Sequence, residues 1–423
     1  MKRFPAAHLF IFAAISLYLF IHASFDDGDY TLFYQATHLF QQRFNPYSLA
    51  AFPHSYGFAY PPIALLIMWI PSLIPWGFSL IFWSLCCYFM LTWSVYAWFD
   101  LLTGSTPDFE EFVWCFLLAC IAPVFWSFWL HQLTMPVFFF ATLSLWLIKR
   151  KNAVFLAGMA GGLLLLKPHL SLPFLALLMM RTPRKGGFLA GFLLITVLSI
   201  APFLSGYRPF TDLRDWKNAI ERHSMLLHNR DDQAIPIKIY QALRFSAQDK
   251  LLLIKYNVRD NPNFMGNLPL IRKENNFKKY SFAMLLGAWI AWLFGMRKKL
   301  DANVCALALT IGVLISSYSH FYDGILLIPL MLWAGFRLAH SWGLANVAAA
   351  AMFASFFLTL AIPFNANPNT PIYWERTAYA SCLYLFIAMA AGGYETICRF
   401  VSRMIFVTSE KIISNKEPKY EAT

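Results

Sequence analysis

The chain has 423 residues, of which 59% are hydrophobic, 18% aromatic and only 13% charged, and its mean hydropathy is +0.52. Soluble globular proteins carry charge on ~25% of their residues, so this composition excludes an ordinary soluble protein. Apolar runs recur along nearly the whole chain. The sequence therefore predicts an all-α polytopic membrane protein.

The net charge of +12 does not indicate a nucleic-acid partner. Many basic residues stand in short tracts between apolar segments, where they orient a membrane protein. The seven cysteines fall almost entirely inside apolar runs and show no CxxC spacing. That pattern argues against a disulfide framework or a cysteine metal site.

Twelve apolar segments are predicted to cross the membrane, with membrane lipids as their surroundings. They are 5–24, 77–99, 111–130, 133–149, 152–167, 169–181, 187–205, 279–296, 303–319, 323–339, 344–363 and 376–394. The first has basic flanks but no small-residue cleavage site, so we expect a retained anchor. We place the proline-bounded run Pro62–Ile70 as a helix at the outer interface, because it is too short to span.

The basic residues orient these segments. If the clusters before residue 152 and after residue 180 are both cytoplasmic, Lys167 and His169 lie at the outward tip of a short hairpin. The short inner segments then carry Lys2, Arg3, Lys149, Arg150, Lys151, Arg181, Arg184, Lys185, Arg297, Lys298, Lys299 and Arg337, whereas the short outer ones carry Arg43, Lys167 and Arg376. This asymmetry supports the predicted orientation of a multi-pass protein, which we expect in the plasma (inner) membrane with its active site on the extracytoplasmic side.

Four parts follow from this topology. We expect a catalytic membrane module over 1–205 with a first outer loop at 25–76, and an extracytoplasmic loop domain over 206–278. A second membrane module covers 279–396 and a cytoplasmic tail covers 397–423.

Polar residues that a bilayer disfavours gather on the predicted outer side. They are Asp26, Asp27, Asp29, His131, Gln132, Lys167, His169, His320, Tyr322 and Asp323. An ionisable group at a helix centre costs ~2.5–3.5 kcal/mol and is rarely kept without a partner or a task. This grouping predicts an active site at the outer membrane surface.

The segment after Asp29 predicts an amphipathic interfacial helix, with Tyr30, Phe33, Thr37, Phe40 and Phe44 on one face. Two interpretations of Asp29 stay open. Its carboxylate either caps this helix or takes a proton from a sugar hydroxyl at the lipid–water boundary.

The other polar motifs have the same two kinds of interpretation. Lys167 either snorkels to the headgroups or pairs with a lipid phosphate. His131 and Gln132 either satisfy backbone groups at a helix end or belong to the active site, and Asp323 either caps a helix or orients His320 or Lys167.

Short motifs follow one another in a fixed order between residue 29 and about residue 330. They are Asp29 with Phe33 and Tyr34, Asn45-Pro46-Tyr47, Tyr60-Pro61-Pro62, Lys167-Pro168 and Tyr322-Asp323. In these motifs the chain resembles glycosyltransferase family 87, polyprenyl-phosphate-mannose-dependent enzymes of the GT-C superfamily. A Gly-Gln-x-Asn element of that family keeps only its glutamine here, in His131-Gln132-Leu133-Thr134.

The resemblance implies a GT-C-type fold and a catalytic aspartate in the first outer loop. We take Asp29 as the base, with Asp27 as the alternative. The donor would be a polyprenyl-phosphate sugar, expected to be mannose, and the acceptor a lipid or a glycan. No cofactor is expected, and although "DDGD" looks like a metal-binding motif, the family favours a metal-free reaction.

The hypothetical mechanism inverts the anomeric carbon. Lys167, helped by His169 and His320, would stabilise the departing phosphate. Tyr34, Tyr47 and Tyr60 would contact the sugar or the lipid, with Asn45, His131, Gln132, Tyr322 and Asp323 completing the substrate site.

Three alternatives remain at this stage. A polymerase or ligase of lipid-linked glycans would use diphosphate donors and essential residues of the long loop, such as Arg222, His223, His228 and Arg230. A transporter or flippase would need a polar path across the bilayer. The third is a receptor or scaffold without catalysis.

Overall fold

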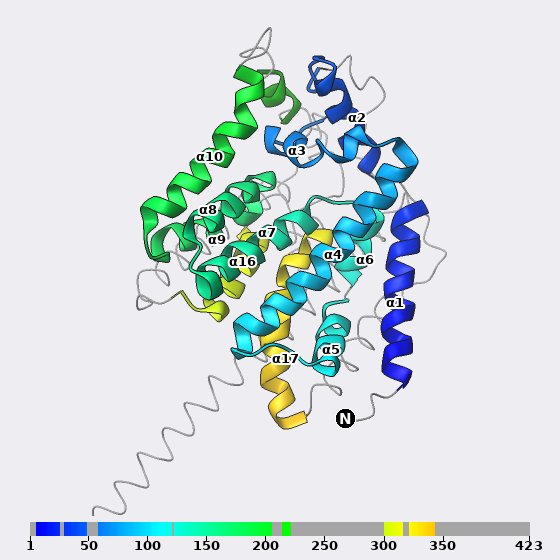
Figure 1. Cartoon of the computed structure of the whole chain (residues 1–423), viewed down its shortest axis with the longest axis vertical. Coiled ribbons are helices and arrows are strands. Elements are labelled where there is room, and N and C mark those ends of the chain that lie inside the picture. Colours follow the sequence, from blue (N-terminus) through cyan, green and yellow to red (C-terminus); the bar gives the residue numbers. More distant parts are fainter. Residues whose placement is uncertain are drawn as a thin grey trace, which may run out of the picture.

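The structure is a computed structural model that describes residues 6–25, 29–48, 58–120, 122–204, 214–220, 300–315 and 321–342. Every regular element within these ranges is a helix or a helical turn, which confirms the all-α prediction for this part of the chain (Figure 1). The predicted segments 279–296, 344–363 and 376–394 lie outside it, as do the cytoplasmic tail and most of the long loop.

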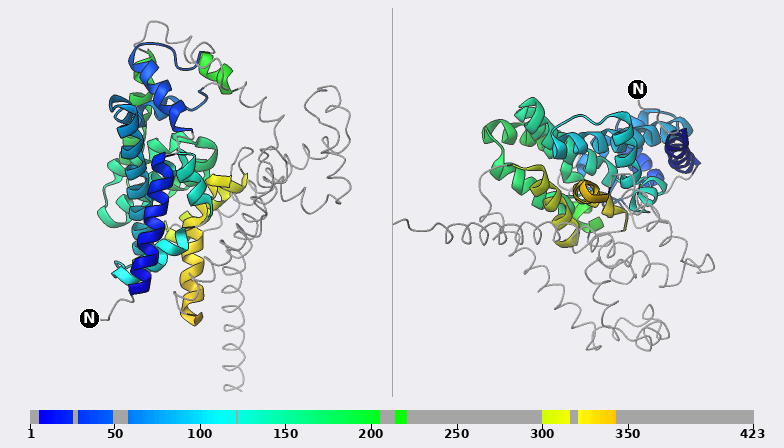
Figure 2. Two further views of the ribbon diagram at one scale, coloured as in Figure 1. Left: turned by 90° about the vertical axis from the view of Figure 1, so that its right-hand side faces the viewer. Right: turned by 90° about the horizontal axis from the view of Figure 1, so that it is seen from below.

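Ten helices of the described residues fall largely on the predicted apolar segments. They are α1 (Ala6–Phe25), α4 (Trp76–Thr103), α5 (Phe109–Ala119), α6 (Ala122–Trp129), α7 (Thr134–Trp146), α8 (Val154–Leu163), α9 (Pro168–Arg181), α10 (Lys185–Leu204), α16 (Ala302–Ile315) and α17 (Ile328–Trp342). Figure 2 shows these helices from the side and from below.

Among the described residues, α4 is the one helix both long and apolar enough to cross a membrane by itself. The pair α5 and α6 passes only as one broken span, because the chain bends by 78° between them. The predicted segment 111–130 is therefore two helices in the structure. Pro123 has no N–H to donate to the Ala119 carbonyl, so the helical hydrogen-bond ladder stops there. The number of twelve spans stays a prediction.

Short helices form one end of the molecule, at the top of Figure 1. They are α2 (Tyr30–Gln41), α3 (Pro62–Ile67) and the 3₁₀ turn η2 (Pro71–Leu73). The helix predicted to begin at Pro62 is present, with proline at its first turn. In α2, three residues of the predicted apolar face, Tyr30, Phe33 and Thr37, are buried in the protein. Phe44 is not, since the helix ends at Gln41 and the Phe44 side chain is 62% exposed.

Helices α8 and α10 pack closely against each other, and this contact shows in which direction α8, α9 and α10 run. A Cβ atom on Gly158 would lie 2.0 Å from the carbonyl oxygen of Phe188, so the two backbones touch where glycine allows it. The starts of both helices lie together, because a Cβ on Gly187 would be 3.9 Å from Val154 Cγ1. The basic clusters at 149–151 and 184–185 thus flank one end, and α9 is the return arm of the predicted hairpin.

A second close approach brings distant chain segments to the tip of that hairpin. A Cβ on Gly312 would lie 1.8 Å from the carbonyl oxygen of Leu170, so α16 packs directly on the first turns of α9. The 3₁₀ segment η6 (Phe321–Leu327) follows α16 and packs against α6 and α7. This arrangement carries Tyr322 and Asp323 to Lys167.

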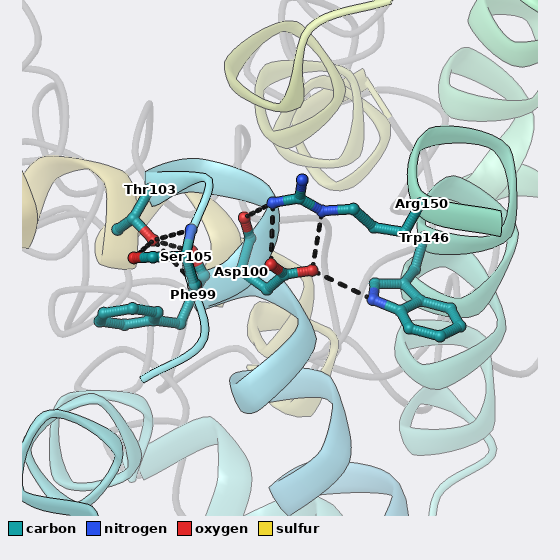
Figure 3. A network of polar contacts seen from close by, with 6 residues as sticks. All are labelled: Phe99, Asp100, Thr103, Ser105, Trp146 and Arg150. Carbon is teal, nitrogen blue, oxygen red and sulfur yellow. Dashed lines mark hydrogen bonds and ion pairs between the residues drawn. The ribbon is translucent and has the colours of Figure 1, made fainter. Parts of the chain in front are cut away.

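The opposite end of the bundle is closed by a polar network (Figure 3). It joins the end of α4 to the π-helical turn η3 (Leu147–Lys151). Arg150 Nε donates to Asp100 Oδ2 at 2.9 Å, and its Nη2 donates to Asp100 Oδ1 at 2.8 Å and to the Asp100 carbonyl at 2.6 Å. Trp146 Nε1 also donates to Asp100 Oδ2, at 3.2 Å.

Candidate active site

Asp29 stands immediately before α2, but its side chain does not cap that helix. Its carboxylate accepts a hydrogen bond from Gln132 Nε2 instead. Its backbone N–H donates to the Leu130 carbonyl at 3.1 Å. The capping interpretation of Asp29 is therefore wrong, and its carboxylate is held by the turn that joins α6 to α7.

That turn exists because His131 adopts a left-handed backbone conformation, with φ of 51°. Such a conformation reverses the chain at the end of α6 and leaves Gln132 to make side-chain contacts. Both side chains are buried. Gln132 Oε1 accepts from the Tyr60 hydroxyl at 3.2 Å, and the His131 ring lies 5.6 Å from that of Tyr30.

Lys167 is the residue before α9, where Pro168 starts the helix. Its Nζ donates to Asp323 Oδ1 and to Thr134 Oγ1, both at 2.8 Å, and lies 4.7 Å from the centre of the Tyr322 ring. Thr134 in turn donates to Asp323 Oδ1 at 2.5 Å. The side chains of Lys167 and Asp323 are only 5% and 1% exposed. The snorkelling interpretation of Lys167 is thus wrong, while the prediction that Asp323 orients Lys167 is confirmed.

The Asp29 carboxyl group and the Lys167 ammonium group influence one another electrostatically. Burial raises the pKa of the Asp29 carboxyl above its ordinary value, while the hydrogen bond from Gln132 and the positive charge of Lys167 act in the opposite direction. His169, in the first turn of α9, lies within range of the charges on Asp323 and Lys167. Gln132, which bonds Asp29, and Thr134, which bonds Lys167 and Asp323, stand two residues apart at the start of α7, so one turn joins these groups in a single site.

Two of the predicted residues, Asp27 and His320, lie outside the described residues, and so does Asp26. The choice of Asp29 over Asp27 and the metal-free reaction accordingly stay predictions.

Other residues that were predicted to contact the substrate hold together the segments that carry Asp29 and Tyr60. The Tyr34 hydroxyl donates to the Ile74 carbonyl at 2.9 Å. Asn45 Oδ1 accepts from the backbone N–H of Tyr47 at 2.9 Å, and the Tyr47 hydroxyl donates to the Tyr60 carbonyl at 3.2 Å. These bonds give Tyr34, Asn45 and Tyr47 a structural role in the loop that carries Asp29 and Tyr60.

The sequence analysis missed three residues of this region. Thr134 had a signal, since it begins α7 two residues after Gln132, but we noted it only as a departure from the family pattern. Asp215 and Trp216 had none. Asp215 accepts from Asn45 Nδ2 at 2.8 Å, and Trp216 Nε1 donates to the Ala59 carbonyl at 3.1 Å.

A half-buried carboxylate, Asp29, within electrostatic range of the buried ammonium group of Lys167 suits a transferase that removes a proton from an acceptor and stabilises an anionic leaving group. The family model of glycosyltransferase family 87 matches residues 58–317, well over half of the chain. The protein therefore belongs to glycosyltransferase family 87 and is a glycosyltransferase. The matched range contains Tyr60, Gln132, Thr134 and Lys167, whereas Asp29 and Asp323 lie just outside it. Searches of curated proteins and of solved structures found no match.

Proposed function

We propose that the protein is an inverting, integral membrane glycosyltransferase of the plasma membrane. It moves a sugar, expected to be mannose, from a polyprenyl-phosphate donor to a lipid or glycan acceptor on the extracytoplasmic face. The observation that carries this proposal is the joint site of Asp29 and Lys167. It supplies a base and a cation in a largely dehydrated setting.

In the proposed reaction the acceptor hydroxyl gives its proton to Asp29 as its oxygen attacks the anomeric carbon. The bond from that carbon to the phosphate oxygen breaks, and the electron pair leaves with the polyprenyl phosphate. A phosphate monoester has a second pKa near ~6, so it leaves as an anion without a strong acid. Lys167, which Asp323 and Thr134 hold in place, neutralises this charge at low dielectric.

The test measures transfer by the purified protein in lipid nanodiscs, with a polyprenyl-monophosphate mannose donor. Asp29→Asn should lower kcat/KM by about 10²–10⁴-fold, the usual contribution of a general base. Asp100→Asn is the matched control, because it removes a buried carboxylate at the opposite end and should leave transfer unchanged. Transfer by folded Asp29→Asn at nearly the wild-type rate would overturn the assignment of the base.

Two companion measurements sharpen this result. An Asp27→Asn variant with normal transfer would support the choice of Asp29 within the acidic cluster. A diphosphate-linked donor used faster than the monophosphate would instead identify a polymerase or ligase of lipid-linked glycans.

Sidedness is tested separately with single cysteines at Gln42 and Lys185, which are both exposed and lie at opposite ends of the bundle. An impermeant maleimide added to intact cells should label the protein with cysteine at 42 and not the one with cysteine at 185, above the wild-type background. The reverse pattern would place the site in the cytoplasm.

A further inference from the structure

A chain of two hydrogen bonds runs from the Tyr60 hydroxyl through the Gln132 amide to the Asp29 carboxylate. The Tyr60 ring is fixed by two neighbours, Phe33 at 4.8 Å and Phe58 at 5.9 Å between ring centroids. Its carbonyl accepts from the Tyr47 hydroxyl at 3.2 Å. Ring and backbone are thus held, and the hydroxyl is aimed at Gln132.

The direction of the donors along this chain follows from chemistry. An ionised carboxylate only accepts hydrogen bonds, so the Gln132 amide must present its NH₂ group to Asp29. Its oxygen then points the other way and accepts from the Tyr60 hydroxyl at 3.2 Å. A hydrogen bond received on the oxygen polarises the amide and strengthens the bond that its NH₂ group donates.

We propose that Tyr60 is a positioning residue that acts through the Gln132 amide to keep Asp29 ionised and correctly oriented. The proposal rests on the function proposed for Asp29. Once Asp29 has accepted the proton of the acceptor hydroxyl, its carboxyl group is neutral and accepts a weaker hydrogen bond from the Gln132 amide. The chain from Tyr60 through Gln132 therefore stabilises the ionised form of the base more than its protonated form.

Other groups also act on Asp29 and define the background for a test. Lys167 supplies positive charge from the hairpin tip, and Asp323, from η6, partly neutralises it. Tyr30 follows Asp29 in the chain, and His131 follows Leu130, whose carbonyl accepts from the Asp29 N–H. The rings of Tyr30 and His131 lie 5.6 Å apart. None of these groups is altered by removing the hydroxyl of Tyr60.

The test is the pH dependence of kcat/KM, whose acidic limb reports ionisation of the base. Tyr60→Phe keeps the ring and should move this limb to higher pH by up to roughly half a unit, because one hydrogen bond strengthens the next in a chain by about 10–30%. Gln132→Met should move it by about one to two units, because it removes a bond to the charged group itself. In the Gln132→Met background, Tyr60→Phe should cause no further shift.

The matched control is Tyr88→Phe, which removes a half-buried hydroxyl that donates to Ser16 Oγ at 2.8 Å, between α4 and α1. It should leave the pH profile unchanged. If Gln132→Met does not fold, Gln132→Asn serves the same purpose, because the shorter side chain cannot span both partners.

Two results would overturn the inference: an unshifted limb in Tyr60→Phe, or the same shift with and without Gln132. Both results differ from a failure of the proposed function, because that failure would show itself as transfer activity in the Asp29→Asn variant.

Discussion

Two ion pairs tie helices together at opposite ends of the molecule, and they are built differently. The pair at the active site joins Lys167 to one oxygen of Asp323, with side chains 5% and 1% exposed. The pair at the other end joins Arg150 to both oxygens of Asp100 and to its carbonyl, with side chains 35% and 12% exposed.

These differences indicate different tasks. The guanidinium group of Arg150 forms a planar fork that satisfies Asp100 and ties the end of α4 to η3, which is a structural fastening. The ammonium group of Lys167 is a compact charge that bonds a carboxylate, a hydroxyl and an aromatic face, with Asp29 within electrostatic range. Such a charge suits the binding of an arriving phosphate, because a lysine can exchange donors among several acceptors.

The strongest way to break this comparison is to remove Asp323. Asp323→Ala leaves the Lys167 ammonium group buried without its carboxylate and should lower the free energy of unfolding by about 3–5 kcal/mol. Thermal unfolding in detergent measures the loss. The double variant Lys167→Met, Asp323→Leu should recover most of the stability but not the transferase activity. A double variant that transfers sugar would contradict the role given to Lys167.

A smaller effect is expected at Thr134, the hydroxyl shared by both partners of the buried pair. Thr134→Val keeps the shape but removes a hydrogen bond to each charged group, which should cost about 1–3 kcal/mol of stability. Thr134→Ser keeps the hydroxyl and serves as the control in the same unfolding measurement. Equal losses for valine and serine would show that packing of the methyl group, and not the hydroxyl, matters at this position.

The fastening at the opposite end should tolerate change better. Asp100→Asn should destabilise the protein by about 1 kcal/mol or less, since Arg150 is partly exposed and water screens its charge. The KM for the donor should stay at the wild-type value, and added salt should narrow the difference in unfolding midpoint. A loss as large as that of Asp323→Ala would remove the distinction between the two pairs.

The smallest effect concerns Asp29 and depends on pH. Burial raises the pKa of its carboxyl in the folded protein. Between the unfolded and folded pKa values the folded state binds more protons, so stability falls as pH rises through that window. Asp29→Asn carries no charge and should unfold at a slightly higher temperature than wild type at pH 7.5, with the difference disappearing toward pH 4. A lower midpoint at pH 7.5 would show that Gln132 and Lys167 outweigh the cost of burial.

Much of this arrangement could be predicted from the sequence. Apolar runs and prolines located the helices, and the pattern of basic residues grouped Asp29, Gln132, Lys167 and Asp323 before any contact was known. The salt bridge between Lys167 and Asp323 was only one of two options, because it depends on how closely α16 approaches α9 at Gly312. The roles of Tyr34 and Asn45 were not predictable, since their partners are backbone carbonyl and N–H groups or a residue of the distant segment 214–220.

That distant segment has a practical consequence for protein engineering. Asp215 and Trp216 bind Asn45 and the Ala59 carbonyl, so the beginning of the long loop is fastened to the loop that carries Asp29. Chimeras that exchange the long loop between relatives should place their first junction after residue 220. A junction at 206 would replace Asp215 and Trp216 but keep Asn45 and Ala59, so these two hydrogen bonds would join residues from different proteins.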